Sequence, residues 1–180
     1  MRRLLLLRHA KTETDAPSGH DQDRRLDDRG RSDAAEIGHW IGRHAPFPEL
    51  VLVSTAVRAR QTWDLVWEAM KDGVPAPEVE IVDELYGAEP TQLLRIVRMA
   101  ASSDPKQLML VGHNPGMHEM ALMLAGSGDK ASIKAVEDNL PTTGLAIIDF
   151  DIKDWTDVAF RGGKLARFVS PKLLRQMSKD

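Results

Sequence analysis

Short apolar runs and amphipathic helical patterns alternate along most of this chain, and no other feature of the sequence constrains the fold as strongly. Four of the runs have the length and composition of buried strands, at 4–7, 50–54, 79–85 and 107–113. A helical pattern follows each run, at 31–44, 55–73, 90–102 and 116–126. Such alternation predicts a largely parallel sheet with helices on both faces, joined by right-handed crossovers. We therefore predict a three-layer α/β/α fold.

The pattern changes after residue 126. Three later runs alternate like strands separated by turns, at 144–151, 155–160 and 164–170. We expect late strands to pair antiparallel at one edge, which makes the central sheet mixed but mostly parallel. The sequence has no internal repeat and no break in composition, and its 180 residues suit one domain. We therefore predict a single α/β domain over residues 1–180.

The composition excludes several classes of function. A net charge of −3 gives no basic field for nucleic acid or an anionic membrane. Because the chain has no cysteine, disulfides, thiolate catalysis and cysteine-based zinc sites are excluded. No stretch approaches the ~20 apolar residues that span a bilayer, and the run at 4–7 is shorter than the ~7–15 residues of a signal-peptide core. We expect a soluble, cytoplasmic protein.

Polar side chains follow three of the predicted strands at the point where each strand ends. They are Arg8 with His9, Ser54 with Arg58 in the next helix, and His113 with Asn114. Because the carboxyl ends of parallel strands meet on one side of a sheet, we expect these side chains to lie close together. Arginine presents a planar fork of donors that matches phosphate oxygens, and a helix N-terminus adds N–H donors. The sequence therefore predicts a pocket for a tetrahedral dianion.

Three segments carry a resemblance to a known family, "RHAKT" at 8–12, "VSTAVRARQT" at 53–62 and "VGHNPG" at 111–116. Together they resemble the histidine phosphatase superfamily, and within it the small SixA-type phosphohistidine phosphatases. The second segment matches the family pattern Ser-x-x-x-Arg-Ala-x-Gln-Thr position by position, and Gly112-His113 matches a later Gly-His. Two positions depart from the pattern, since Ala10 replaces a glycine of the wider superfamily and Arg25 replaces a proline of the SixA type. The resemblance implies a phosphoglycerate mutase-like fold.

The resemblance also implies a role for each residue of the pocket. His9 would be the nucleophile that takes the phosphoryl group onto a neutral ring nitrogen. Arg8, Arg58 and His113 would bind the equatorial oxygens and stabilise charge as the phosphoryl group transfers. No metal or other cofactor is needed, because the arginines supply the positive charge. Glu84 is the candidate acid that protonates the leaving group.

These residues also have plain structural interpretations. An isolated Arg-His pair is most often a hydrogen-bonded strand end, and only the two later motifs make a nucleophile of it. Ser54 is either a substrate-binding residue or a simple turn residue, and we place Asn114 in the same substrate-binding set. Glu84 is either an acid or an ordinary strand-end carboxylate. Arg60 lies about 100° round the helix from Arg58, so we expect it to face solvent or an ion-pair partner.

We predict a metal-independent phosphatase that forms a phosphohistidine on His9. Its predicted substrate is phosphohistidine in a protein, such as a phosphotransfer domain of a two-component relay. One alternative is a phosphatase of a small metabolite with the same mechanism, and another is a non-catalytic module that binds a phosphorylated partner. The segment 11–30 follows the nucleophile strand without periodicity, so it should lie at the rim of the pocket. We expect a monomer without nucleic-acid or membrane partners.

Overall fold

The computed structural model describes residues 1–44 and 47–178. Within them, seven strands form one sheet in the order β3-β2-β4-β1-β6-β7-β5. Their bounds are β1 Arg2–Arg8, β2 Leu50–Ser54, β3 Glu78–Val82, β4 Gln107–Gly112, β5 Ala125–Gly128, β6 Leu145–Phe150 and β7 Gly163–Val169. The first four strands in this order are parallel, whereas β6 runs antiparallel to β1 and to β7. The predicted mixed, mostly parallel sheet is confirmed.

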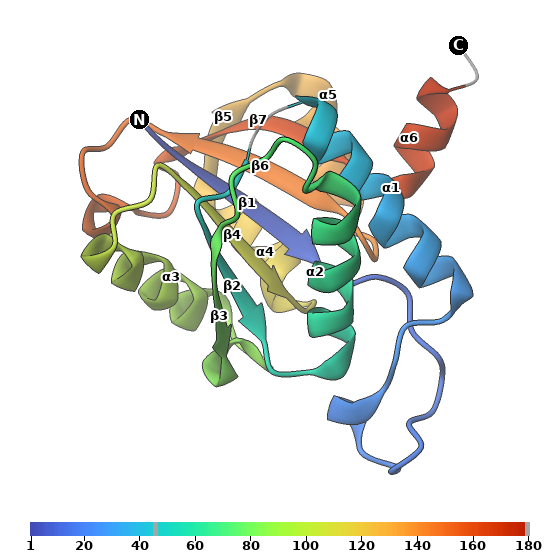
Figure 1. Cartoon of the computed structure of the whole chain (residues 1–180). Coiled ribbons are helices and arrows are strands. Elements are labelled where there is room, and N and C mark those ends of the chain that lie inside the picture. Colours follow the sequence, from blue (N-terminus) through green and yellow to red (C-terminus); the bar gives the residue numbers. More distant parts are fainter. Residues whose placement is uncertain (45–46, 179–180) are drawn as a thin grey trace.

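Helices cover both faces of the sheet (Figure 1). Their bounds are α1 Asp28–His44, α2 Val57–Met70, α3 Pro90–Met99, α4 Gly116–Leu124, α5 Lys130–Asp138 and α6 Pro171–Met177. Short 3₁₀ helices lie in the connections, η1 Asp21–Asp23, η2 Asp83–Leu85, η3 Ala100–Ser102 and η4 Trp155–Asp157. α1 and α2 pack on one face, and α3 and α4 pack on the other, which gives the predicted three layers.

β1 is buried on both faces because its leucines alternate between two hydrophobic cores. Leu4 and Leu6 belong to the core beneath α3 and α4, whereas Leu5 and Leu7 belong to the core beneath α1 and α2. All four side chains are fully buried. Each buried leucine stabilises the fold by roughly 1.5–3 kcal/mol, so β1 is firmly held at the centre of the sheet. The polar residues at its carboxyl end therefore occupy a defined place.

α1 and α2 approach each other closely at Gly38, which lies on the buried face of α1. A Cβ atom at Gly38 would collide with the carbonyl oxygen of Val66 in α2, so the approach depends on glycine. The contact fixes α2 against α1 and the sheet. Because Arg58 lies in the first turn of α2, this packing also fixes the origin of its side chain.

The differences from the predicted elements are local. The strand at 50–54 has the predicted bounds, but the predicted strand at 79–85 ends at Val82, because the next three residues turn into η2. The predicted strand at 155–160 is wrong, since Trp155 begins η4 and is fully buried. The sequence patterns had also predicted neither β5 nor α5 and α6.

Candidate active site

The carboxyl ends of β1, β2 and β4 lie side by side on one side of the sheet (Figure 1). Arg8 is paired with Gly112 in the register of β1 and β4, and the N–H of His9 donates to the carbonyl oxygen of Gly112 at 3.0 Å. The rings of His9 and His113 therefore lie next to each other, with centroids 5.2 Å apart. The structure thus brings together the strand ends that the sequence singled out.

The His9 ring is buried and held by a short hydrogen bond. Its Nδ1 lies 2.8 Å from the carbonyl oxygen of Ala10, an acceptor, so a neutral ring carries its proton on Nδ1 and donates it there. Only 7% of the residue is exposed. Burial is the main cause that lowers the pKa of His9 to about 3; the Ala10 hydrogen bond opposes this shift, and His113, Arg58 and Arg8 add to it. At neutral pH the ring is uncharged, with the Nε2 lone pair available.

His113 is the second buried imidazole of the site. Its Nε2 lies 2.7 Å from the hydroxyl oxygen of Ser54, so Ser54 positions this ring. The ring of Tyr86 meets it edge-on, with centroids 5.5 Å apart. Burial, followed by the charge of Arg58, lowers the pKa of His113 to about 4. In the tautomer whose Nε2 accepts from the Ser54 hydroxyl, the proton of a neutral His113 sits on Nδ1.

Arg58 is held by a residue of the long segment after β1. Its Nη1 donates to the backbone oxygen of Asp21 at 2.8 Å, and its Nη2 donates to the Asp21 carboxylate at 2.9 Å. The hydroxyl of Tyr86 donates to the same carboxylate oxygen at 2.6 Å. These bonds, with Tyr86 first, lower the pKa of Asp21 to about 2. Segment 11–30 therefore reaches the site through Asp21, at the rim where we expected it. Asp21 and Tyr86 together form a clamp on Arg58, which no sequence pattern indicated.

Arg8 and Asn114 meet at one carbonyl group. The Nη1 of Arg8 donates to the oxygen of Leu140 at 3.2 Å, and the Nδ2 of Asn114 donates to the same oxygen at 2.8 Å. The side-chain oxygen of Asn114 accepts from the N–H of His118 at 3.2 Å. Both ends of the Asn114 amide are thus occupied by protein groups. Asn114 therefore positions the chain beside Arg8, and it also lines a cavity together with His113.

Thr143 joins the site from the turn that precedes β6, which the sequence did not predict. Its N–H lies 3.1 Å from the carbonyl oxygens of both Arg8 and His9. Its φ of 61° is unusual for a threonine, and its side chain is fully buried. Only the antiparallel pairing of β6 with β1 could have predicted this position, because it brings the turn against the end of β1.

Four buried polar atoms of the site have no hydrogen-bond partner among the described residues. They are Nε of Arg8, Nε of Arg58, Nδ1 of His113 and the hydroxyl oxygen of Thr143. Buried donors without a partner are rare, and each carries a penalty of roughly 1–3 kcal/mol. Three N–H donors, two of them on guanidinium groups, suit a ligand with several negatively charged oxygens. The arrangement can bind such an anion and offer its central atom the lone pair of His9.

The Gln-Thr pair of the second motif has a structural role. The hydroxyl of Thr62 donates to the carbonyl oxygen of Arg58 at 2.7 Å and accepts from the N–H of Ala10 at 2.9 Å. The side-chain oxygen of Gln61 accepts from the N–H of Leu26 at 2.9 Å. α2 therefore fixes both ends of the segment that follows His9.

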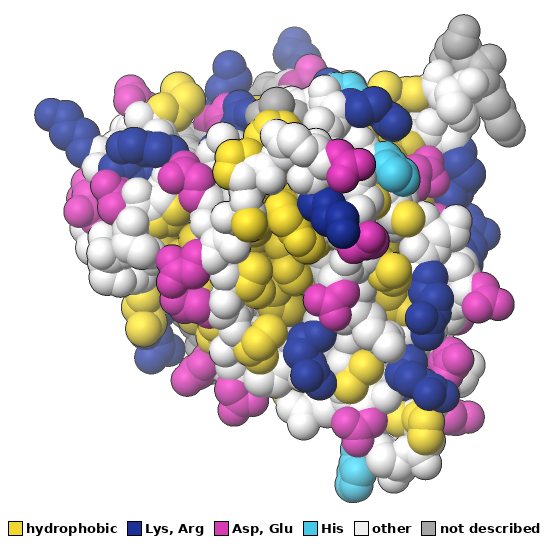
Figure 2. Space-filling view, viewed as in Figure 1, with side chains coloured by type: hydrophobic (Ala, Val, Ile, Leu, Met, Phe, Trp, Pro, Cys, Tyr) yellow, Lys and Arg dark blue, Asp and Glu magenta, His cyan; other side chains and the backbone are white. Residues whose placement is uncertain are grey.

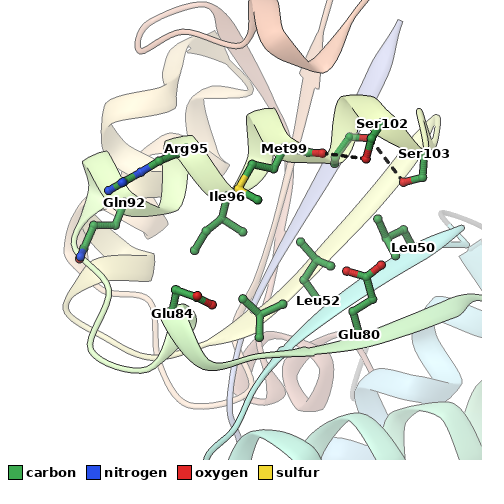
Figure 3. A pocket seen from close by; sticks show the side chains of 12 residues that line it. Leu50, Leu52, Glu80, Glu84, Gln92, Arg95, Ile96, Met99, Ser102 and Ser103 are labelled. Carbon is green, nitrogen blue, oxygen red and sulfur yellow. Dashed lines mark hydrogen bonds between the residues drawn. The ribbon is translucent and has the colours of Figure 1, made fainter.

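Glu84 is the predicted site residue that the structure does not bring together with the others. It is exposed and lines a groove of about 450 Å³ between α3 and the strands β2 and β3 (Figure 3). A different cavity, of about 510 Å³, is lined by His113 with Asn114, and Glu84 is not among its lining residues. The reason is η2, which buries Leu85 and turns Glu84 toward α3. Glu89 and Glu119 are the carboxylates that line the cavity with His113.

No helix in 1–44 or 47–178 is long and apolar enough to cross a membrane. Within the same residues, no group of three or more histidine, aspartate or glutamate side chains is placed to hold a metal ion.

Comparisons with known proteins agree with this geometry. The model of the histidine phosphatase superfamily (branch 1) matches residues 4–89. An uncharacterized protein of Mycobacterium leprae is 31% identical over 172 residues, which cover 92% of this chain and 100% of that protein. An uncharacterized chloroplastic protein of Arabidopsis thaliana is 32% identical and covers 94% of this chain and 78% of its own.

Solved structures extend the likeness to the whole fold. The SixA protein of Agrobacterium tumefaciens is 31% identical, with a TM-score of 0.74 and coverage of 94% of this chain and 98% of its own. The SixA protein of Nakamurella multipartitia is 27% identical, with the same TM-score and coverage of 94% and 96%. The protein histidine phosphatase SixA complexed with tungstate shares the fold, with a TM-score of 0.72, 20% identity and coverage of 96% and 99%. The chain therefore belongs to the histidine phosphatase superfamily, as a member of its SixA type, and it is a phosphatase.

Proposed function

We propose that the protein hydrolyses phosphohistidine carried by another protein, with His9 as the nucleophile. The observation that carries the proposal is the state of the His9 ring. Its Nδ1 is bound to the carbonyl oxygen of Ala10, and its low pKa keeps it neutral. Within the described residues Nε2 makes no hydrogen bond. A neutral, oriented imidazole is what phosphoryl transfer to nitrogen requires.

The reaction has two steps at the same phosphorus atom. First, the Nε2 lone pair of His9 forms a bond to phosphorus, while the bond from phosphorus to the substrate nitrogen breaks and its electron pair leaves on the substrate imidazole. Then a water molecule attacks the phosphorus and the bond to Nε2 breaks. Inorganic phosphate takes up the protons of the water, and His9 returns to its neutral form.

Arg8, Arg58 and His113 act on the charge of the transferring group. Negative charge spreads over three equatorial oxygens during each step, so fixed donors around them stabilise the transition state. Each of the three side chains has a buried N–H donor that no described protein group accepts. Ser54 supports this function by orienting His113, and Asn114 does so by holding the carbonyl group that Arg8 contacts.

The leaving group supports phosphohistidine as the substrate. A substrate imidazole protonated on its other nitrogen leaves as a neutral molecule and needs little help from an enzymic acid. An alkyl phosphate leaves as an alkoxide and depends on general acid catalysis worth ~10²–10⁴ in rate. Glu84, the predicted acid, lies in the groove beside α3 and not in the cavity with His113. A site without this acid suits the imidazole leaving group better.

Glu89 and Glu119 favour a second candidate, a phosphatase of a small phosphorylated metabolite. Both carboxylates line the cavity that contains His113. A protonated carboxyl group there could supply the proton that an alkoxide needs. The first step at His9 would be the same.

The proposal assigns no metal ion or other cofactor to the reaction, because two arginines provide the positive charge. We also propose that the protein acts as a monomer in the cytoplasm on a phosphorylated protein. Neither nucleic acid nor a membrane is a partner in this proposal, in keeping with the net charge of −3.

Phosphate release from three substrates tests the proposal. The purified protein is incubated with a protein phosphorylated on histidine, with alkyl phosphate metabolites and with p-nitrophenyl phosphate, each with and without EDTA. We expect kcat/KM for the phosphohistidine protein to exceed that for alkyl phosphates by at least about tenfold, with no loss in EDTA. Higher values for an alkyl phosphate would establish the metabolite phosphatase instead. No release from any substrate would leave only a phosphate-binding module.

A further inference from the structure

β3 is an edge strand of the sheet, since within residues 1–44 and 47–178 it pairs with β2 alone. The N–H of Glu78 donates to Glu49 beside β2. Because backbone groups of a strand alternate in direction, the N–H and C=O groups of Val79 and Ile81 face away from β2. The edge therefore presents backbone donors and acceptors that a further strand can use.

The side chains of β3 divide by chemistry between its two faces. Glu78 and Glu80 lie beside Leu50 and Leu52 on the face toward α3, whereas Val79 and Ile81 lie on the face toward α2. Val79 is 43% exposed and Ile81 is 52% exposed. Figure 2 shows hydrophobic side chains gathered where β3 and α2 lie in Figure 1, with acidic side chains at their border. Edge strands that avoid pairing with other proteins usually carry charged side chains, and two exposed β-branched residues such as Val79 and Ile81 do not fit that pattern.

The groove beside β3 has an apolar floor and acidic walls. Leu52 and Ile96 line it, and Met99, which is 70% exposed, reaches it from α3. Glu80 and Glu84 line the opposite side, below α3 in Figure 3. Lysine and arginine side chains suit such a groove, because their methylene stems cover apolar surface while their charged ends stay at the rim.

The charge around the groove is one-sided. No Lys or Arg lies between Lys71 and Arg95, but six acidic residues do, Asp72, Glu78, Glu80, Asp83, Glu84 and Glu89. In the described part of the chain, none of the six is within 4.0 Å of a basic nitrogen. Arg95 lines the groove without forming such a pair. The surface is thus complementary to a cationic partner.

We propose that β3 and this groove dock an extended segment of a partner protein in which basic residues alternate with apolar ones. The segment would add to the sheet as a strand beside β3. Its basic side chains would lie on the α3 face against Glu78 and Glu80, and its apolar side chains would cover Val79 and Ile81. A second copy of this chain fits less well: antiparallel pairing of two β3 strands would place their glutamates on the same face, where like charges repel, and parallel pairing would place them beside Val79 and Ile81 of the other copy.

The docking surface leads to the active site along the chain. η2 connects β3 to Tyr86, whose ring meets His113 and whose hydroxyl binds Asp21. A segment docked beside β3 therefore brings its protein next to the pocket. That the docked protein is the phosphorylated substrate rests on the proposed function, whereas the docking itself does not.

A synthetic peptide tests the docking directly. The probe is a capped octapeptide, (Lys-Val)₄, titrated into ¹⁵N-labelled protein at low salt. We expect amide shifts in residues 78–85 and along α3, and binding that weakens as salt is added. A peptide N-methylated on every second residue keeps the charges but loses the strand pairing, and (Glu-Val)₄ reverses the charges. We expect neither control to bind the groove.

A pair of double variants makes the test specific. Glu78→Gln with Glu80→Gln removes two exposed carboxylates from β3, and Glu137→Gln with Asp138→Asn removes two exposed carboxylates from α5. We expect the first pair to weaken binding by about tenfold and the second to change it by less than about twofold. Equal effects of the two pairs, shifts confined to residues outside 78–85 and α3, or equal binding of the N-methylated peptide would overturn the proposal.

Turnover of p-nitrophenyl phosphate keeps this proposal separate from the proposed function. We expect the β3 double variant to turn over this small substrate at the wild-type rate. A protein that binds the peptide in the groove but hydrolyses none of the three phosphorylated substrates would retain the docking surface and lose the proposed function. A protein that hydrolyses them but binds no peptide would do the opposite.

Discussion

Arg58, in the pocket around His9, is buried and held in place, whereas the glutamates along β3 are exposed and form no ion pair with a described residue. Arg58 is 5% exposed and bound on both terminal nitrogens by Asp21. Every residue from Glu78 to Ile81 is exposed, and the two glutamates have no basic partner among the described residues. The two regions nevertheless belong to one sheet and are joined by η2 and Tyr86.

Buried donors in the pocket and exposed carboxylates on β3 should differ in their effect on the stability of the fold. A buried donor without a partner destabilises the protein by roughly 1–3 kcal/mol, so the pocket lowers the stability of the fold. An exposed carboxylate changes stability by less than about 0.5 kcal/mol. Variants in the pocket should therefore alter both the turnover rate and the free energy of unfolding. Variants along β3 should change neither the free energy of unfolding nor the turnover of small substrates.

Replacing His9 gives the largest expected effect. His9→Ala removes the atom that forms the bond to phosphorus, so kcat should fall by about 10⁴-fold or more. The fold should remain, because the residue lies at a strand end and the core leucines of β1 are untouched. Steady-state kinetics and circular dichroism check the two parts. A variant that keeps turnover within about tenfold of wild type would show that His9 is not the nucleophile.

Arginine variants rank next. Arg8→Ala and Arg58→Ala each remove a donor to the transferring oxygens, which costs ~3–4 kcal/mol or about 10²–10³ in kcat. Arg60 is exposed on the same helix as Arg58 and is the matched control. Arg60→Ala should cost less than about 1 kcal/mol. Equal losses of kcat in Arg58→Ala and Arg60→Ala would contradict the assignment of Arg58, and not Arg60, to the transferring oxygens.

The clamp on Arg58 should give a smaller effect. Asp21→Ala removes the carboxylate that accepts from Arg58 and from Tyr86 but keeps the backbone carbonyl that accepts from Nη1. Because the Asp21 side chain is 52% exposed, we expect a loss of about fivefold in kcat/KM. Tyr86→Phe should lose less, since it removes one of these bonds. A loss as large as that of Arg58→Ala would place Asp21 in the chemistry itself.

The two buried histidines predict how stability depends on pH. Their pKa values are about 3 and about 4 in the folded protein, and an unfolded histidine titrates near 6.5. The unfolded chain therefore binds more protons as pH falls below 6.5, so stability is complete above that pH and decreases toward pH 4. At pH 5 each histidine should contribute a loss of about 1–2 kcal/mol.

Thermal unfolding in buffers without phosphate or sulfate measures this loss. The midpoint should fall by roughly 5 °C between pH 7.5 and pH 5, and His113→Gln should reduce the difference. His39→Gln, at an exposed position of α1, is the control and should leave the difference unchanged. Identical pH profiles for the wild type and His113→Gln would contradict the burial of a neutral pair.

Glu84→Gln should have the smallest effect, because the side chain lies in the groove and not with His113. We expect kcat/KM for phosphohistidine and for alkyl phosphate to change by less than about threefold. The ratio of the two effects, measured on one preparation, is the readout. A selective loss on the alkyl phosphate of about tenfold or more would restore Glu84 as the general acid.

The sequence predicted the centre of the fold well because its signals there are local. Four consecutive leucines identify β1, and the helical period identifies α1 and α2. The predictions of other elements were wrong or missing for local reasons too. Trp155 and the residues after it alternate like a strand, but the carboxylate of Asp154 accepts from the N–H of Thr156 at 2.8 Å and starts a 3₁₀ turn. α5 is nine residues long and only its Val136 is buried, so it offers few apolar positions by which a helix can be predicted.

The site shows the same division between local and distant signals. Arg8, His9, Arg58 and His113 follow strands within a few residues, and the topology brings them together. Tyr86 and Asp21 are 65 residues apart, so no spacing pattern announces their hydrogen bond. The position of Glu84 depended on whether β3 ended before or after it. Because β3 ends at Val82, the turn of η2 decides the direction of that side chain.

Trapping the phosphorylated intermediate is the most direct test of whether His9 carries the phosphoryl group. The enzyme is mixed with labelled phosphohistidine protein, quenched within milliseconds at alkaline pH and digested for mass spectrometry. The account predicts an acid-labile phosphoramidate on His9 that is absent from the His9→Ala variant. Label on Ser54, on His113 or on no residue of a protein that still releases phosphate would contradict it.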